Sequence, residues 1–133
     1  MLDYQSGHHT DANDGRLDQL EPDWMPDLVK MPRLYDHSGG REPFKTAYAE
    51  SLYQLVQSQG RPDRAITVYR AIPLKHPQVI NVGDWVTASK RYAELHAEQS
   101  NDDCGIVELT CRVRDLRCEG NDANELGYFP ETD

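Results

Sequence analysis

A charged residue interrupts the apolar pattern of a predicted strand. Residues 66–72 alternate in polarity, and Arg70 occupies the same face as Ile66, Val68 and Ile72. An inward arginine keeps its charge and requires an anion or several hydrogen-bond acceptors. Arg70 therefore indicates a phosphate or carboxylate ligand beside the strand. A salt bridge within the protein, and a strand end at which Arg70 reaches solvent, are the alternative interpretations.

Two hydroxyl side chains lie where a second predicted strand leads into a helix. Thr87 and Ser89 share one face of the segment 85–89, so their hydroxyls can line one wall of a cleft. The predicted helix spans 90–99, and Ser89 stands at its N-cap, where a serine accepts a backbone N–H. The third helical residue is Tyr92, so no capping box accompanies this serine. Capping alone would explain Ser89.

An acidic residue follows a predicted turn near the end of the chain. Glu125 comes after the turn at 120–122 and lies within the extended segment 124–129. At the mouth of a strand, its carboxylate can hydrogen-bond a ribose hydroxyl and stabilise a cationic transition state. A solvated surface acid is the alternative interpretation.

Several motifs of catalysis and metal binding are absent from the sequence. It contains no G-x-x-x-x-G-K-S/T, no G-x-G-x-x-G, no H-E-x-x-H and no G-x-S-x-G. The cysteines Cys104, Cys111 and Cys118 recur every seven residues, whereas zinc sites favour closely spaced pairs. We expect reduced thiols and no metal site.

Short helices and strands must position these residues. A helix is predicted from 43 to 58, and a further strand from 106 to 113. Because the elements lack regular βαβ spacing, the pattern indicates an α+β fold and not a doubly wound parallel sheet. The predicted core-facing stripe of the first helix consists of Phe44, Ala47, Tyr48, Leu52, Leu55 and Val56.

The start of this helix also marks a predicted boundary. Residues 1–45 contain six Leu, Ile or Val residues, whereas residues 66–118 contain fourteen. We expect residues 1–42 to form an irregular acidic arm that packs on the core, and residues 43–133 to form the folded domain. The candidate packing residues of the arm are Trp24, Met25, Leu28 and Tyr35.

The charge balance argues against some partners. The formal net charge is -9, and most acids lie in the first 45 and last 34 residues. Binding to a nucleic-acid backbone needs clustered Lys and Arg, so we expect no direct nucleic-acid partner. The N-terminus lacks an apolar signal segment, and no run approaches the roughly 20 apolar residues of a membrane span. We expect no membrane partner and a cytoplasmic location.

Three blocks of sequence, taken in order, resemble a known family. They resemble the ADP-ribosyltransferase-like domains of phage proteins, including the large polyvalent ones, over roughly residues 27–130. The resemblance is to the arginine–serine–glutamate branch, and it implies two small antiparallel sheets around an NAD cleft with flanking helices. The blocks are Val68–Pro73, Ile80–Ser89 with Tyr92, Ala93, Glu94 and His96, and Glu119–Tyr128.

The resemblance also implies roles for individual residues. Glu125 would be the catalytic glutamate that hydrogen-bonds the nicotinamide ribose as the glycosidic bond breaks. Arg70 would assist catalysis by holding the phosphate and ribose side of NAD. The implied NAD-binding residues are Arg70, Thr87 and Ser89 of a Ser/Thr-x-Ser element, and either Tyr92 or Tyr128 stacked on nicotinamide.

The function implied by the resemblance is mono-ADP-ribosyl transfer from NAD to a protein of a bacterial host. A phage-encoded inhibitor of a defence complex such as CRISPR-Cas would act in this way. Arginine-modifying relatives carry Glu or Gln two residues before the catalytic glutamate, whereas this chain carries Ala123, which argues against an arginine acceptor. The alternatives are an inactive binder that blocks its target stoichiometrically, and an NAD glycohydrolase.

Overall fold

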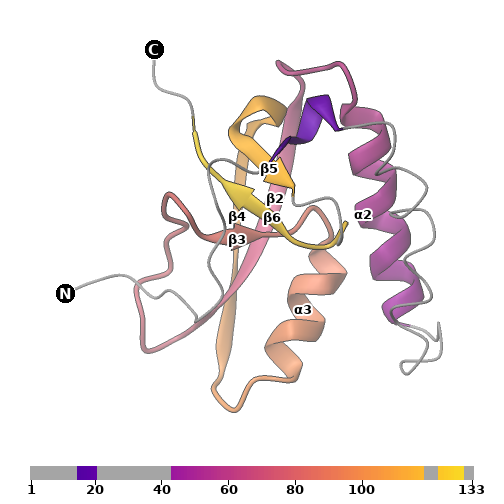
Figure 1. Ribbon diagram of the computed structural model, residues 1–133. Helices are drawn as coiled ribbons and strands as arrows, with labels where there is room; N and C mark the ends of the chain where they lie inside the picture. The colour runs from indigo at the N-terminus through magenta and orange to yellow at the C-terminus, as the bar shows by residue number, and fades with distance from the viewer. Residues whose placement is uncertain (1–14, 21–42, 119–122, 131–133) are drawn as a thin grey trace.

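The structure is a computed structural model that describes residues 15–20, 43–118 and 123–130. Within these residues the chain is α+β, with two α-helices, two short 3-10 helices and six strands (Figure 1). The helices are η1 (Leu17–Gln19), α2 (Phe44–Ser58), α3 (Lys90–Glu98) and η3 (Val113–Asp115). The strands are β1 (Gly15–Arg16), β2 (Ala65–Pro73), β3 (Trp85–Val86), β4 (Cys104–Arg112), β5 (Leu116–Cys118) and β6 (Leu126–Tyr128).

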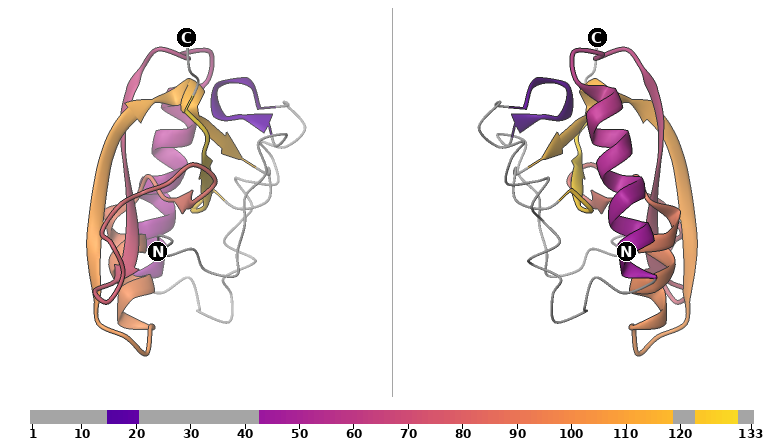
Figure 2. Two further views of the ribbon diagram at one scale, coloured as in Figure 1. Left: turned by 90° about the vertical axis from the view of Figure 1, so that its left-hand side faces the viewer. Right: turned by 90° about the vertical axis from the view of Figure 1, so that its right-hand side faces the viewer.

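The strands form two small antiparallel sheets, which confirms the α+β class that the sequence predicted. β2 and β4 pair along their whole length, from Ala65 opposite Arg112 to Pro73 opposite Cys104. The other sheet has the order β1-β5-β6-β3. Side views show the β2–β4 ribbon along one outer edge of the molecule, with α2 and the short strands on its inner side (Figure 2).

Within the described residues, one isolated backbone bridge joins the two sheets. Tyr69 of β2 and Thr87, which directly follows β3, exchange backbone hydrogen bonds of 2.8 and 2.9 Å. Arg70 lies next to this pair on β2, and Ser89 follows Thr87 by two residues, at the start of α3. The pair therefore fixes how two of the predicted site segments face each other.

The first helix is amphipathic, but its buried stripe differs from the predicted one. Val56 was predicted to face the core, and it is 47% exposed. Ser51 and Ser58 are buried in its place because each hydroxyl has an acceptor. Ser51 donates to Asn124 Oδ1 at 2.7 Å, and Ser58 donates to the Gln54 carbonyl at 2.7 Å. The buried residues of α2 are Ala47, Tyr48, Ser51, Leu55 and Ser58.

The core draws on α2, on both sheets and on residues from the predicted arm. Leu17 of η1 is fully buried, and β1 pairs with β5. The core side chains Leu17, Leu55, Val68, Val86, Val113 and Leu116 belong to one cluster. Burial of each such aliphatic side chain contributes about 1.5–3 kcal/mol. Trp24, Met25, Leu28 and Tyr35 lie outside the described residues.

No helix in the described parts of the chain is long and apolar enough to cross a membrane.

Candidate functional site

Arg70 is buried inside the protein and is paired there. Its side chain is 1% exposed, and its Nη1 donates to the Trp85 carbonyl at 2.9 Å. The Nε atom lies 3.7 Å from Asp84 Oδ2, and the guanidinium carbon lies 5.2 Å from the centroid of the Trp85 ring. The sequence alternative in which Arg70 reaches solvent is therefore wrong, because the strand is covered at this position.

A tight turn before β3 presents Asp84 to Arg70. The Asp84 carboxylate accepts the Asn81 backbone N–H at 2.7 Å, and the Asp84 backbone N–H bonds to the Asn81 carbonyl at 3.0 Å. Gly83 has φ +90°, a conformation that glycine adopts without a steric penalty. Its N–H donates to the Tyr128 carbonyl at 2.8 Å, so β6 helps to hold the turn.

Ser89 is the N-cap of α3, as its position predicted. Its Oγ accepts the Tyr92 N–H at 3.1 Å, and its own backbone N–H donates to Thr87 Oγ1 at 3.2 Å. Both hydroxyl residues are almost fully buried, at 1% and 0% exposure. They brace the junction between β3 and α3.

Glu50 of α2 belongs to this junction, although the sequence analysis did not single it out. Ser89 Oγ donates to Glu50 Oε1 at 2.7 Å, across 39 residues of chain. In the sequence, Glu50 is one acid on the polar side of an amphipathic helix, so only the folded structure brings it to α3. The signal that could have pointed to Glu50 was indirect: Ser89 is an N-cap serine whose helix supplies no capping-box acid.

The Glu125 carboxylate is held by an aromatic residue. The Tyr92 hydroxyl donates to Glu125 Oε2 at 2.7 Å, and the Tyr92 ring packs edge-on against Trp85 with centroids 6.2 Å apart. Glu125 is half-buried. The residue before it, Asn124, is anchored to Ser51 of α2. The structure thus connects Arg70, Trp85, Tyr92 and Glu125 through successive contacts.

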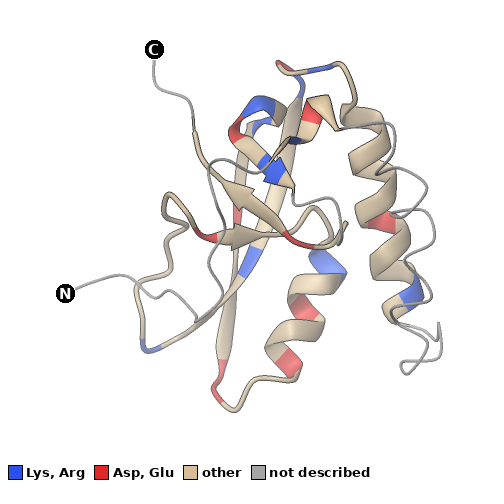
Figure 3. Cartoon of the chain, viewed as in Figure 1, with Lys and Arg blue, Asp and Glu red and all other residues tan. Residues whose placement is uncertain are grey.

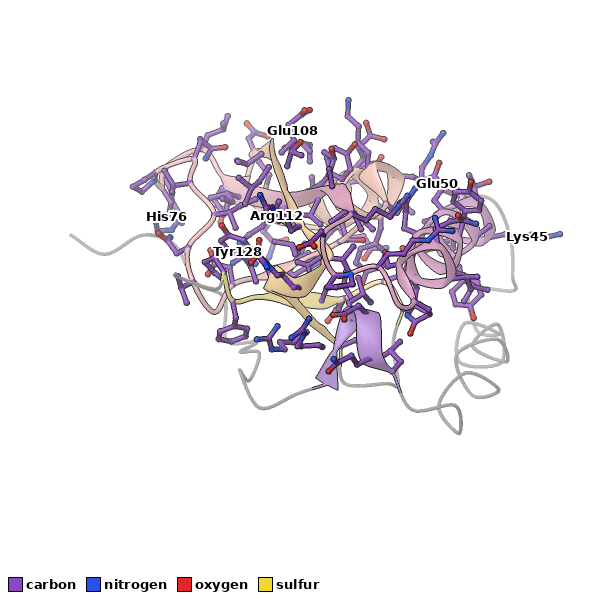
Figure 4. All side chains as sticks on the ribbon, turned by 90° about the horizontal axis from the view of Figure 1, so that it is seen from above. Lys45, Glu50, His76, Glu108, Arg112 and Tyr128 are labelled. Carbon is purple, nitrogen blue, oxygen red and sulfur yellow. The ribbon has the colours of Figure 1, made fainter. Side chains whose placement is uncertain are left out.

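Tyr128 lies in a different place. Together with Cys111 and Asp115 it lines a cavity of about 480 Å³ near the end of β4. Figure 4 shows Tyr128 beside Arg112 and well apart from Glu50. Burial and the neighbouring Cys111 and Asp115 raise the pKa of Tyr128, and burial and Asp115 raise the pKa of Cys111 to about 12. Of the two candidate tyrosines, Tyr92 is the one that contacts Glu125.

An open groove of about 600 Å³ runs beside Glu50. Its walls come from α2, from Tyr69 of β2 and from the start of α3. Figure 4 shows Lys45, at the N-terminal end of α2, pointing outward from the molecule. The lining residues are Lys45, Thr46, Ala49, Glu50, Tyr53, Gln54, Tyr69, Ala88 and Lys90.

The first turn of α3 is basic. Lys90 and Arg91 open the helix, and Glu94 and Glu98 follow further along (Figure 3). No acid of α3 lies in its first turn. Glu50 therefore supplies a carboxylate where a helix N-terminus favours negative charge.

The described residues contain no group of three or more His, Cys, Asp or Glu side chains that could hold a metal ion. All three cysteines are free thiols. Comparison with protein-family models, with curated proteins and with solved structures finds no match to this chain.

Proposed function

We propose that the protein is a mono-ADP-ribosyltransferase that uses NAD to modify a protein of a bacterial host. The observation that carries the proposal is the 2.7 Å hydrogen bond from Tyr92 to Glu125. It brings together the second and third of the sequence blocks that resemble this family. Trp85 extends the contacts to Arg70 in the first block.

The chemistry requires a carboxylate beside the nicotinamide ribose. The bond between ribose C1′ and the nicotinamide nitrogen breaks, and its electron pair leaves with nicotinamide. The ribose becomes an oxocarbenium-like cation, which a carboxylate stabilises more than the ground state. Glu125 would take this role, with Tyr92 holding one of its oxygens. An acceptor atom then bonds to C1′ and releases its proton to solvent.

Arg70 fits this function as a residue behind the site. Its guanidinium fixes the Trp85 carbonyl and packs over the Trp85 ring, which in turn contacts Tyr92. A direct contact with the NAD diphosphate would require the guanidinium to be uncovered and to leave Asp84. Thr87 and Ser89 support the proposal in the same indirect way, because they are buried and hold the start of α3.

The position two residues before Glu125 bears on the choice of acceptor. Ala123 is 1% exposed and has no polar side chain, so it cannot orient an incoming nucleophile. The position that bears an acid or amide in arginine-modifying relatives is therefore inactive in this chain. We therefore propose that the acceptor is a side chain other than arginine.

Labelled NAD incubated with host lysate tests the function. The wild-type protein should label a protein band and release nicotinamide, whereas Glu125→Gln should do neither. Glu108→Gln, the same substitution at an exposed position of β4, serves as the matched control and should behave as wild type. If the wild-type protein neither labels a protein nor releases nicotinamide, the proposal is wrong.

Two further functions remain as candidates. Nicotinamide release without a labelled protein would identify an NAD glycohydrolase. The burial of Arg70 against Asp84 specifically favours an inactive binder that blocks its target, because the cation is already neutralised inside the protein. Calorimetry would then detect no NAD binding, and Glu125→Gln would retain full inhibition of the target.

A further inference from the structure

A chain of hydrogen bonds joins Glu50 on α2 to Glu125 before β6. Glu50 accepts from the Ser89 hydroxyl, Ser89 accepts from the Tyr92 N–H, and the Tyr92 hydroxyl donates to Glu125. We propose that Glu50 is a positioning residue that sets the geometry of Glu125 through Ser89 and the first turn of α3. The catalytic consequence rests on the proposed function, whereas the structural coupling does not.

The Ser89 hydroxyl has only one proton, and its direction decides what the oxygen can accept. Donation to the Glu50 carboxylate at 2.7 Å is a charge-assisted hydrogen bond, the stronger kind. It fixes the proton on the α2 side and leaves the oxygen lone pairs for the Tyr92 N–H at 3.1 Å. A polarised hydroxyl is also a better acceptor, because bonds in a chain strengthen one another.

The electrostatics of α3 give Glu50 a second effect on this turn. Lys90 and Arg91 place two positive charges at the helix end that already carries the positive pole of the macrodipole. Glu50 adds a carboxylate from another element beside this turn, through its hydrogen bond to the capping Ser89. Loss of Glu50 would therefore loosen the first turn of α3 without emptying the core, since Glu50 itself is exposed.

Tyr92 transmits the position of this turn to Glu125. Its backbone N–H is the group that Ser89 caps, and its phenol oxygen lies at the far end of a long side chain. A small rotation of the turn therefore displaces the hydroxyl from the Glu125 carboxylate. Misplacement of a reacting group by about 1 Å can lower the rate by about 100-fold.

Kinetics of nicotinamide release separate positioning from simple stabilisation. Glu50→Ala should lower kcat by about 10-fold or more while the KM for NAD changes by less than about 2-fold. Glu50→Gln keeps a hydrogen-bond acceptor of the same shape and should recover most of the lost kcat. The control Glu108→Ala should match wild type. Unchanged kcat in Glu50→Ala would overturn the proposal.

A spectroscopic measurement tests the coupling without NAD. The ¹³Cζ resonance of Tyr92, assigned by its loss in Tyr92→Phe, reports the hydrogen bond of the phenol. Glu125→Gln establishes how far the resonance moves when the acceptor changes. Glu50→Ala and Ser89→Ala should each move it in the same direction, whereas Glu108→Ala should not. If the resonance stays at its wild-type position in Glu50→Ala, the coupling is absent.

The two measurements fail separately. A wild-type protein that releases no nicotinamide, but whose Tyr92 resonance responds to Glu50→Ala, would refute the proposed function and retain the positioning role. Active wild-type protein with an unresponsive Tyr92 resonance would retain the proposed function and refute the positioning role.

Discussion

The two ends of the candidate site differ in how their charges are satisfied. At one end, Arg70 and Asp84 are both buried and lie against each other. At the other end, Glu125 is half-buried and Glu50 is exposed, and each carboxylate accepts from a neutral hydroxyl. A buried charge cannot lose its partner without a large desolvation cost, whereas an accessible carboxylate can exchange one donor for another. The arginine end therefore contributes to stability, and the carboxylate end is the part to which the proposed function assigns the ligand.

The largest effect is expected from breaking the buried pair. Arg70→Met should lower the free energy of unfolding by about 3–5 kcal/mol, because Asp84 would remain as an uncompensated buried charge. Urea denaturation measures this change. Asp84→Asn combined with Arg70→Met should recover a substantial part of the loss. A loss below about 1 kcal/mol in the single variant would mean that the pair contributes no more than an exposed salt bridge.

The carboxylate end should tolerate substitution with little loss of stability. Glu125→Gln keeps an acceptor for Tyr92 and should change the free energy of unfolding by no more than about 0.5 kcal/mol. The same denaturation experiment measures it. A destabilisation as large as that of Arg70→Met would remove the contrast between the two ends.

The sequence predicts the regular parts of this molecule better than its site. Periodicity identifies α2, β2, α3 and β4, because each presents at least two turns or four alternating residues. β5 was not predicted, since Leu116–Cys118 is too short for an alternating pattern and is stabilised by pairing with β1 and β6.

The site residues show the same limit. Ser89 was predicted as a cap because capping is local, and its contact was found. Glu50 and Asp84 were missed. Each gains its role from a partner that only the fold brings close, which is Ser89 for Glu50 and Arg70 for Asp84. The choice between Tyr92 and Tyr128 likewise depends on which face of the fold each ring occupies, which residue types cannot reveal.

The smallest effect on stability at neutral pH is expected for a substitution of Cys111, which lies away from both ends of the candidate site. The pKa of Cys111 is raised from 9.0 to about 12 by burial and by Asp115, so the folded state favours the neutral thiol. This contribution to stability is fully present below about pH 9 and is lost as the pH rises toward 12. Cys111→Ala should match the pH dependence of wild type near pH 7 and lose less stability between pH 9 and 11. Thermal unfolding across that range measures the difference, and parallel curves would contradict it.

The isolated backbone bridge between the two sheets has a consequence for motion. Segments that share one backbone bridge, and no backbone ladder among the described residues, can change their relative twist at the cost of few hydrogen bonds. Such a twist turns about Tyr69 and Thr87, so displacements are smallest beside that pair and grow along the strands. Arg70 and Ser89 lie close to this point of least displacement. Thermal bending of the long β2–β4 ribbon would then leave the spacing between Arg70 and Ser89 nearly constant.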